Sequence, residues 1–155
     1  MLLYRTAQGA VARRDDRWCV VPNAGWDALI NNRQLHDQVA EALHRGPPMT
    51  EPEVLAPIEG QEVWAAGVTY LRSRSARMRE SEIGGASDFY DRVYHAERPE
   101  LFFKANRHRV IAPGKALHLR SDSRWVVPEP ELALLVNRRA EVVGYTVGND
   151  LSCRD

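Results

Sequence analysis

Two strand-like runs near the C-terminal end of the sequence constrain its fold more than any other feature. The runs cover residues 125–136 and 141–147, and the four residues Asn137 to Ala140 join them. Two such runs with a short connection are typical of a β-hairpin. If the turn centres near Arg139, Asp150 faces either Pro128 or Glu129. This difference of one residue decides to which face of the sheet the Asp150 side chain points.

A proline-rich segment divides the sequence in two. Between Gly46 and Gly60 lie Pro47, Pro48, Pro52 and Pro57. Proline does not extend a helix and is rare in central strands, so the segment is the best candidate for a linker. We therefore predict a small α+β domain over residues 1–46, a linker over 47–57 and a second domain over 58–155.

The first domain is expected to combine short strands with one helix. Strand candidates lie around Leu3, around Val11 and at 18–21, with turn signals between them. Apolar residues recur at helical spacing over 34–45. Gly46 follows as a typical stop signal, so we expect the helix to end there.

The second domain is expected to be rich in strands. Before the hairpin, the expected elements are a strand at 62–68, a helix at 71–82 and strands at 101–103 and 116–120. The strand at 62–68 is apolar enough to be buried. We also expect Trp64 and Trp125 to lie in the core rather than to serve as stacking surfaces.

Composition excludes several classes of function. The 21 basic residues balance the 21 acidic ones, which weakens any nucleic-acid or anionic-membrane role. The longest apolar runs hold only about half a dozen residues, far short of a membrane span. Cys19 and Cys153 lie far apart without a C-x-x-C motif, which favours free thiols in a reducing cytoplasm.

A pair of carboxylates marks the start of the hairpin. Glu129 and Glu131 are two residues apart in a predicted strand, so their side chains point to the same face. Pro128 and Pro130 flank Glu129 and place this part of the strand at an edge or a bulge. In one of the two possible registers, Asp150 joins them and three carboxylates converge.

Two interpretations of these carboxylates remain open from spacing alone. Like charges on facing positions destabilise a sheet unless a cation neutralises them. An all-oxygen set of ligands suits Mg²⁺, Mn²⁺ or Ca²⁺ better than Zn²⁺. The commoner explanation of an E-x-E spacing, however, is the polar face of an exposed edge strand.

Four stretches in the same order resemble the fumarylacetoacetate hydrolase family, and most of all its 2-keto-3-deoxy-arabinonate or -xylonate dehydratase branch. They are VWAAGVTYLRSRSARMRES at 63–81, YDRVYHAERPELFFKA at 90–105, VPEPELALLVN at 127–137 and GYTVGNDLSCRD at 144–155. The resemblance implies an α+β fold, in which a small N-terminal α+β unit precedes an incomplete mixed β-sheet roll of that family's C-terminal-domain type.

The resemblance also implies a metal site. The family's E-x-E metal pair falls on Glu129 and Glu131, and the aspartate of its N-D-x-S-x-R motif falls on Asp150. The arginine that ends this motif falls on Arg154, which would bind the substrate carboxylate as a bidentate partner. Mg²⁺ is the expected metal.

Further site residues follow from the resemblance. Glu100 corresponds to a glutamate implicated in catalysis in the dehydratase branch, just before the L-F-F-K-A stretch. Arg72 and Ser73 directly follow the G-x-T-Y loop and are expected near the substrate.

The sequence departs from the family in two ways. The family's hydrolases carry a water-activating histidine shortly after the G-x-N-Y motif, but residues 71–75 contain none. This favours a dehydratase over a hydrolase. Family members also continue beyond the position of Asp155, through more of the sheet and an active-site lysine, so we expect a C-terminally truncated chain.

The expected function is a Mg²⁺-dependent lyase of the cytoplasm. It would dehydrate 2-keto-3-deoxy sugar acids such as 2-keto-3-deoxy-D-arabinonate to 2,5-dioxopentanoate in pentose oxidation. The expected partners are a small 2-keto acid and further copies of the chain, without nucleic acid or membrane. One alternative is a hydrolase of fumarylacetoacetate or acylpyruvate type. An alternative of another class is an inactive fragment or assembly module.

Overall fold

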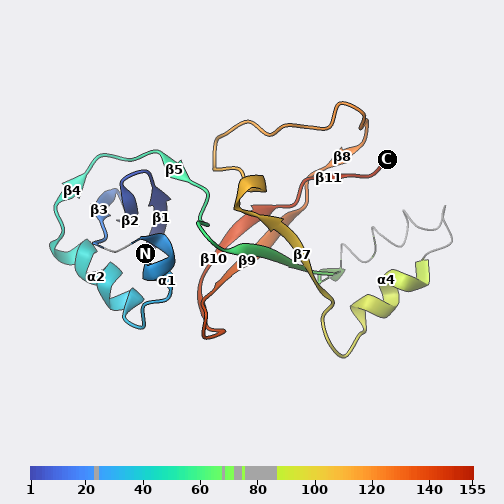
Figure 1. Ribbon diagram of the computed structural model, residues 1–155, viewed down its shortest axis with the longest axis horizontal. Coiled ribbons are helices and arrows are strands. Elements are labelled where there is room, and N and C mark those ends of the chain that lie inside the picture. The colour runs from blue at the N-terminus through green and yellow to red at the C-terminus, as the bar shows by residue number, and fades with distance from the viewer. Residues whose placement is uncertain (23–24, 68, 72–74, 76–86) are drawn as a thin grey trace. The chain divides into compact units, whose positions relative to one another are not determined.

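The computed structural model describes residues 1–22, 25–67, 69–71, 75 and 87–155 (Figure 1). Their contacts group them into two compact units. One unit holds residues 1–60 together with 111–155, and the other holds residues 61–110. Within the described residues, no helix has the length and apolar character needed to cross a membrane. The predicted division into residues 1–46, 47–57 and 58–155 stays a prediction.

The first unit begins with an antiparallel sheet. Strands β1 (Leu2–Thr6), β2 (Gly9–Arg14) and β3 (Arg17–Val20) form at the three places that the sequence predicts. Gly9 and Asp15 both have positive φ angles, 109° and 53°, in the tight turns that connect the strands. Such turns need residues that tolerate the left-handed region, as glycine and aspartate do.

Two helices pack on this sheet and form the core with it. Helix α1 spans Trp26–Ile30 and helix α2 spans Leu35–Arg45. The predicted helical spacing is confirmed, because Leu35, Val39, Ala42 and Leu43 are all buried on one face of α2. Gly46 caps α2 with an extended conformation, as predicted for the stop signal.

The proline-rich segment contributes both edges of this sheet. Strand β4 (Pro48–Met49) pairs with β3, and strand β5 (Val54–Leu55) pairs with β1, giving the strand order β4-β3-β2-β1-β5. Proline is tolerated at a sheet edge, where the missing N–H removes no ladder bond.

The second unit contains a two-stranded antiparallel sheet. Strand β6 (Glu62–Ala66) pairs with strand β7 (Leu101–Asn106). The other elements among the described residues of this unit are helix α4 (Ser87–Tyr94) and the short 3-10 helix η1 (Arg107–Arg109). The predicted helix at 71–82 lies largely outside the described residues.

Three expectations about residues 58–155 are wrong. Trp64 and Trp125 were predicted in the core, yet their exposed fractions are 59% and 50%. Strand β6 is likewise half exposed, because only one further strand pairs with it among the described residues. Residues 116–120 form no strand, although they alternate, because no other described segment pairs with them.

The predicted hairpin is present in the first unit. Strand β9 (Pro130–Val136) pairs with strand β10 (Val142–Asn149) in antiparallel fashion, and β8 (Val126–Val127) pairs with β11 (Ser152–Cys153) as its continuation. Near the turn, Leu135 and Val143 pack against the buried core of the first unit. The Asn31 side-chain oxygen accepts a hydrogen bond from the Arg138 amide (2.9 Å), which holds the turn against α1.

Candidate metal centre

A β-bulge fixes the register of the hairpin. Val142 pairs with Val136, but Gly144 pairs with Leu135, so Val143 is an extra residue in β10. Beyond the bulge the pairing is regular and brings Asn149 opposite Pro130. Of the two predicted registers, the structure therefore adopts the one in which Asp150 faces Glu129.

The backbone confirms this pairing on both sides of the carboxylates. The Asp150 amide donates to the Glu129 carbonyl at 2.9 Å, and the Arg154 amide donates to the Trp125 carbonyl at 2.9 Å. Residues that face each other across antiparallel strands point their side chains to the same face. Glu131, two positions after Glu129, shares that face as well.

The three carboxylates converge as this register predicts. Glu129, Glu131 and Asp150 each offer one oxygen, and these oxygens all lie within 4.8 Å of one another. All three residues are partly buried. Three negative charges at this separation repel strongly unless a cation joins them.

The chemistry of the donor set fits a hard divalent cation. Carboxylate oxygens are the ligands that Mg²⁺ prefers, and a Mg²⁺ site normally adds waters or substrate oxygens to one or more protein carboxylates. The cluster contains no thiolate or imidazole, the ligands that favour Zn²⁺. These residues can therefore hold Mg²⁺. That they bind it stays a prediction.

Glu129 is held by side chains of the segment that faces it. Arg154 forms an ion pair with Glu129 through Nη2 and Oε1, and the side chains are only 12% and 22% exposed. The Ser152 hydroxyl lies 3.1 Å from the other carboxylate oxygen, Oε2. The Glu129 amide donates to Asn149 Oδ1 at 3.0 Å. Both oxygens of this carboxylate thus meet a hydrogen-bond donor.

Sequence reasoning placed Arg154 at the substrate and overlooked Ser152. The signal for Ser152 was present, since Asp150, Ser152 and Arg154 alternate at the period of a strand. In the extended segment that pairs with residues 125–129, this alternation brings all three side chains to the face that carries Glu129.

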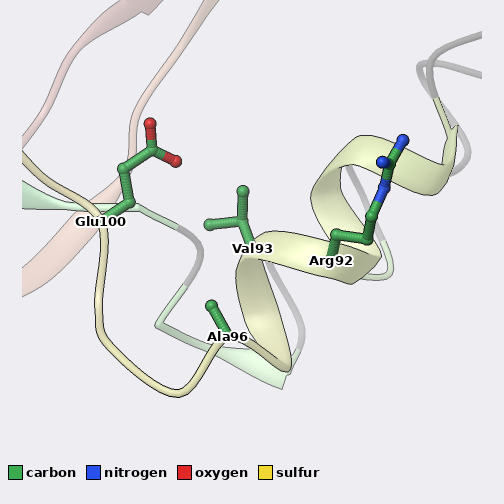
Figure 2. A pocket seen from close by; sticks show the side chains of 4 residues that line it. All are labelled: Arg92, Val93, Ala96 and Glu100. Atoms are coloured by element: carbon green, nitrogen blue, oxygen red, sulfur yellow. The ribbon is translucent and has the colours of Figure 1, made fainter.

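The other predicted site residues belong to the second unit. Glu100 lies directly before β7, is exposed, and its carbonyl accepts a hydrogen bond from the Gly67 amide at 2.8 Å. Figure 2 shows the Val93 and Ala96 side chains pointing toward Glu100 around a shallow hollow that Arg92 also lines.

Of the three predicted substrate-binding residues, Arg154 lies beside Glu129, and Arg72 and Ser73 lie outside the described residues.

Comparisons with known proteins point to one class of enzyme. A probable 2-keto-3-deoxyxylonate dehydratase of Haloferax volcanii is 54% identical over 98 residues, which are 63% of this chain and 32% of that protein. The 2-dehydro-3-deoxy-D-arabinonate dehydratase of Saccharolobus solfataricus is 37% identical over 131 residues, covering 81% of this chain and 44% of that protein. No protein-family model matches the chain.

Solved structures show the same relationship. A 2-keto-3-deoxy-D-arabinonate dehydratase complexed with magnesium and 2,5-dioxopentanoate superimposes with a TM-score of 0.67 at 30% identity. The match covers 94% of this chain and 52% of that one. The apo form of the same enzyme gives a TM-score of 0.67 at 29% identity. The expected α+β fold of the dehydratase branch is thereby confirmed.

The chain spans about a third to a half of the length of these relatives. In the structural comparison, the match covers 94% of this chain. In sequence and in fold, the chain is therefore similar to the 2-keto-3-deoxy sugar-acid dehydratases over about a third to a half of their length.

Proposed function

We propose that this chain carries the metal-binding part of a Mg²⁺-dependent dehydratase that acts on a 2-keto-3-deoxy-pentonate. The observation that carries the proposal is the convergence of Glu129, Glu131 and Asp150 within 4.8 Å. The similarity to dehydratases, one of them solved with magnesium and 2,5-dioxopentanoate, supports the choice of metal and substrate. Mn²⁺ or Ca²⁺ would fit the same oxygen ligands.

The proposed reaction removes water from the substrate. A proton leaves C3 and the hydroxyl group leaves C4, and tautomerisation then gives 2,5-dioxopentanoate. A divalent cation, when bound, supplies Lewis acidity at the 2-keto and carboxylate oxygens and so makes the C3 proton more acidic.

The residues of the chain have separate roles in this proposal. Glu129, Glu131 and Asp150 hold the cation. Arg154 receives the substrate carboxylate, since it is the arginine that ends the N-D-x-S-x-R motif and a guanidinium can bind a carboxylate in bidentate fashion. Glu100 transfers a proton, either from C3 as a base or to the C4 hydroxyl as an acid.

Arg72 and Ser73 are proposed as further substrate contacts because of their place after the G-x-T-Y loop. The absence of histidine from residues 71–75 supports water elimination over C–C bond hydrolysis, which needs a base that activates water.

The test is a product assay with two substrates. The purified chain is incubated with Mg²⁺ and one of two substrates, 2-keto-3-deoxy-D-arabinonate or an acylpyruvate. Each incubation is run with the chain alone and with a second polypeptide added, which is the part of the Haloferax relative that the chain does not match. We expect 2,5-dioxopentanoate, detected by NMR, and none with Glu129→Gln. Glu100→Gln should abolish turnover and leave the metal affinity unchanged. Release of pyruvate from an acylpyruvate, without dehydration in either arm, would reverse the proposal in favour of a hydrolase.

A further inference from the structure

The Glu129 carboxylate contacts one charged and one neutral side chain of the segment that faces it. Arg154 pairs with Oε1, and the Ser152 hydroxyl reaches Oε2 at 3.1 Å. Both neighbours come from the same extended segment, which pairs with residues 125–129. The side chain of Glu129 is therefore held from one direction through both of its oxygens.

We propose that Ser152 is a positioning residue that aims the Glu129 carboxylate at the metal. This inference rests on the proposed metal centre. The proposed reaction itself assigns no step to Ser152. A glutamate side chain has three rotatable bonds. When neighbouring residues already hold both of its oxygens, it loses less conformational freedom as the metal binds. Partners of this kind, which bind a ligand rather than the metal, commonly affect metal affinity by roughly 10- to 100-fold.

The geometry of Ser152 favours this role over a purely structural one. Its hydroxyl also lies 3.3 Å from the Asp150 carbonyl, longer than its distance to Glu129. A hydroxyl carries a single proton, so it can donate fully to only one of the two acceptors. The carboxylate is the stronger acceptor, because hydrogen bonds to ionised groups are shorter and stronger than those to neutral carbonyls.

The chain offers a matched control at Ser123. Its hydroxyl also bonds to a carboxylate, Asp155 Oδ1, at 2.6 Å. Asp155 is not a member of the carboxylate cluster. Ser123→Ala therefore removes a hydroxyl–carboxylate bond of the same kind without touching Glu129.

The experiment is a titration of the full 155-residue chain with Mn²⁺, followed by electron paramagnetic resonance of the free ion. We expect Ser152→Ala to weaken Mn²⁺ binding by roughly 10- to 100-fold. Ser152→Thr, which keeps a hydroxyl on the same carbon, should restore most of the affinity, and Ser123→Ala should bind like the wild type. Circular dichroism spectra of all variants report whether each remains folded.

The outcomes separate this inference from the proposed function. Tight binding by Ser152→Ala, or failure of Ser152→Thr to restore the affinity that Ser152→Ala loses, would overturn the role of the hydroxyl while leaving the metal centre intact. A loss of equal size in Ser123→Ala would overturn it as well. If the wild-type chain binds no Mn²⁺, the proposed metal centre fails, and the positioning role fails with it.

Discussion

Asp150 lies directly opposite Glu129 in the hairpin, with its amide nitrogen 2.9 Å from the Glu129 carbonyl oxygen. Facing residues share a face of the sheet, so two carboxylates that are far apart in sequence meet with Glu131 at one place. An arrangement of like charges in this position costs stability in the absence of a cation. Arg154 offsets part of this repulsion through its ion pair with Glu129, and a bound cation would offset more.

The first prediction concerns the stability of the metal-free chain. Asp150→Asn removes one of the three converging charges and should raise the melting temperature, by about 2–4 °C for each ~1 kcal/mol of repulsion relieved. Thermal unfolding in EDTA measures this. Asp122→Asn is the control, because the Asp122 carboxylate pairs with Arg120 and its loss should not be stabilising. A lower melting temperature for Asp150→Asn would contradict the prediction.

The second prediction concerns the bulge at Val143. Because Val143 is the extra residue, its deletion should leave Asp150 opposite Glu129 and keep metal binding. Deletion of Val142 and Val143 together should shift the register by one residue and turn the Asp150 side chain to the other face. Mn²⁺ titration of both variants tests the register. Equal affinity in the two variants would show that the register does not control the site.

The third prediction concerns acid stability at the hairpin turn. Hydrogen bonds from the Asn137 side chain and from Arg139 hold the pKa of Glu141 below its ordinary value. Since the pKa of Glu141 is lower in the folded state, its ionised carboxylate stabilises the fold at pH values above the ordinary glutamate range. This stabilisation is lost as the pH falls through the lower, folded-state pKa. Glu141→Gln should therefore be less stable than the wild type at pH 7, and this difference should shrink at about pH 3.

Urea unfolding of both proteins at the two pH values measures the change. The comparison uses the difference between wild type and variant, so titration of the other carboxylates cancels. A difference that stays constant between the two pH values would mean that the ionised form of Glu141 does not stabilise the turn.

The fourth prediction concerns the face of the hairpin opposite the carboxylates. Six apolar side chains, each at least 48% exposed, lie on β9 and β10: Leu132, Leu134, Val136, Val142, Tyr145 and Val147. An apolar face of this kind promotes association. We expect the isolated chain to self-associate, and Leu134→Lys with Tyr145→Glu, a directly facing pair, to shift it toward monomer.

Sedimentation velocity distinguishes the two states. Leu119→Lys is the control, because Leu119 is 58% exposed but lies outside the hairpin. A wild-type chain that remains monomeric at high concentration would contradict the expected homo-oligomer.

Much of this fold could be predicted because its signals are local. The strands around Leu3 and Val11 and the helix ending at Gly46 follow from short-range periodicity and stop signals. The exposure of Trp64 could not be predicted, because burial depends on which segments cover a strand, and periodicity is silent on that.

The pairing register that forms the carboxylate cluster could be predicted from the sequence only to within one residue. Turn position and alternation allowed Asp150 to face Pro128 or Glu129, and a bulge at Val143 selects between them. Bulges depend on packing around the strand, here including the contact of Val143 with the core, and apolar alternation alone does not reveal them. Ser152 was missed because the alternation of Asp150, Ser152 and Arg154 does not show that Ser152 lies near Glu129 until the register is known.

The binding of a divalent cation by Glu129, Glu131 and Asp150 is tested most directly by Mn²⁺ titration of the wild-type chain beside Glu131→Gln. Glu131 is the ligand to change, because it is a member of the cluster and is not the residue whose positioning by Ser152 is tested separately. We expect one Mn²⁺ site in the wild type, competed by Mg²⁺, and its loss in Glu131→Gln. Equal Mn²⁺ binding by the two proteins, or none by the wild type, would contradict a metal centre at these three residues.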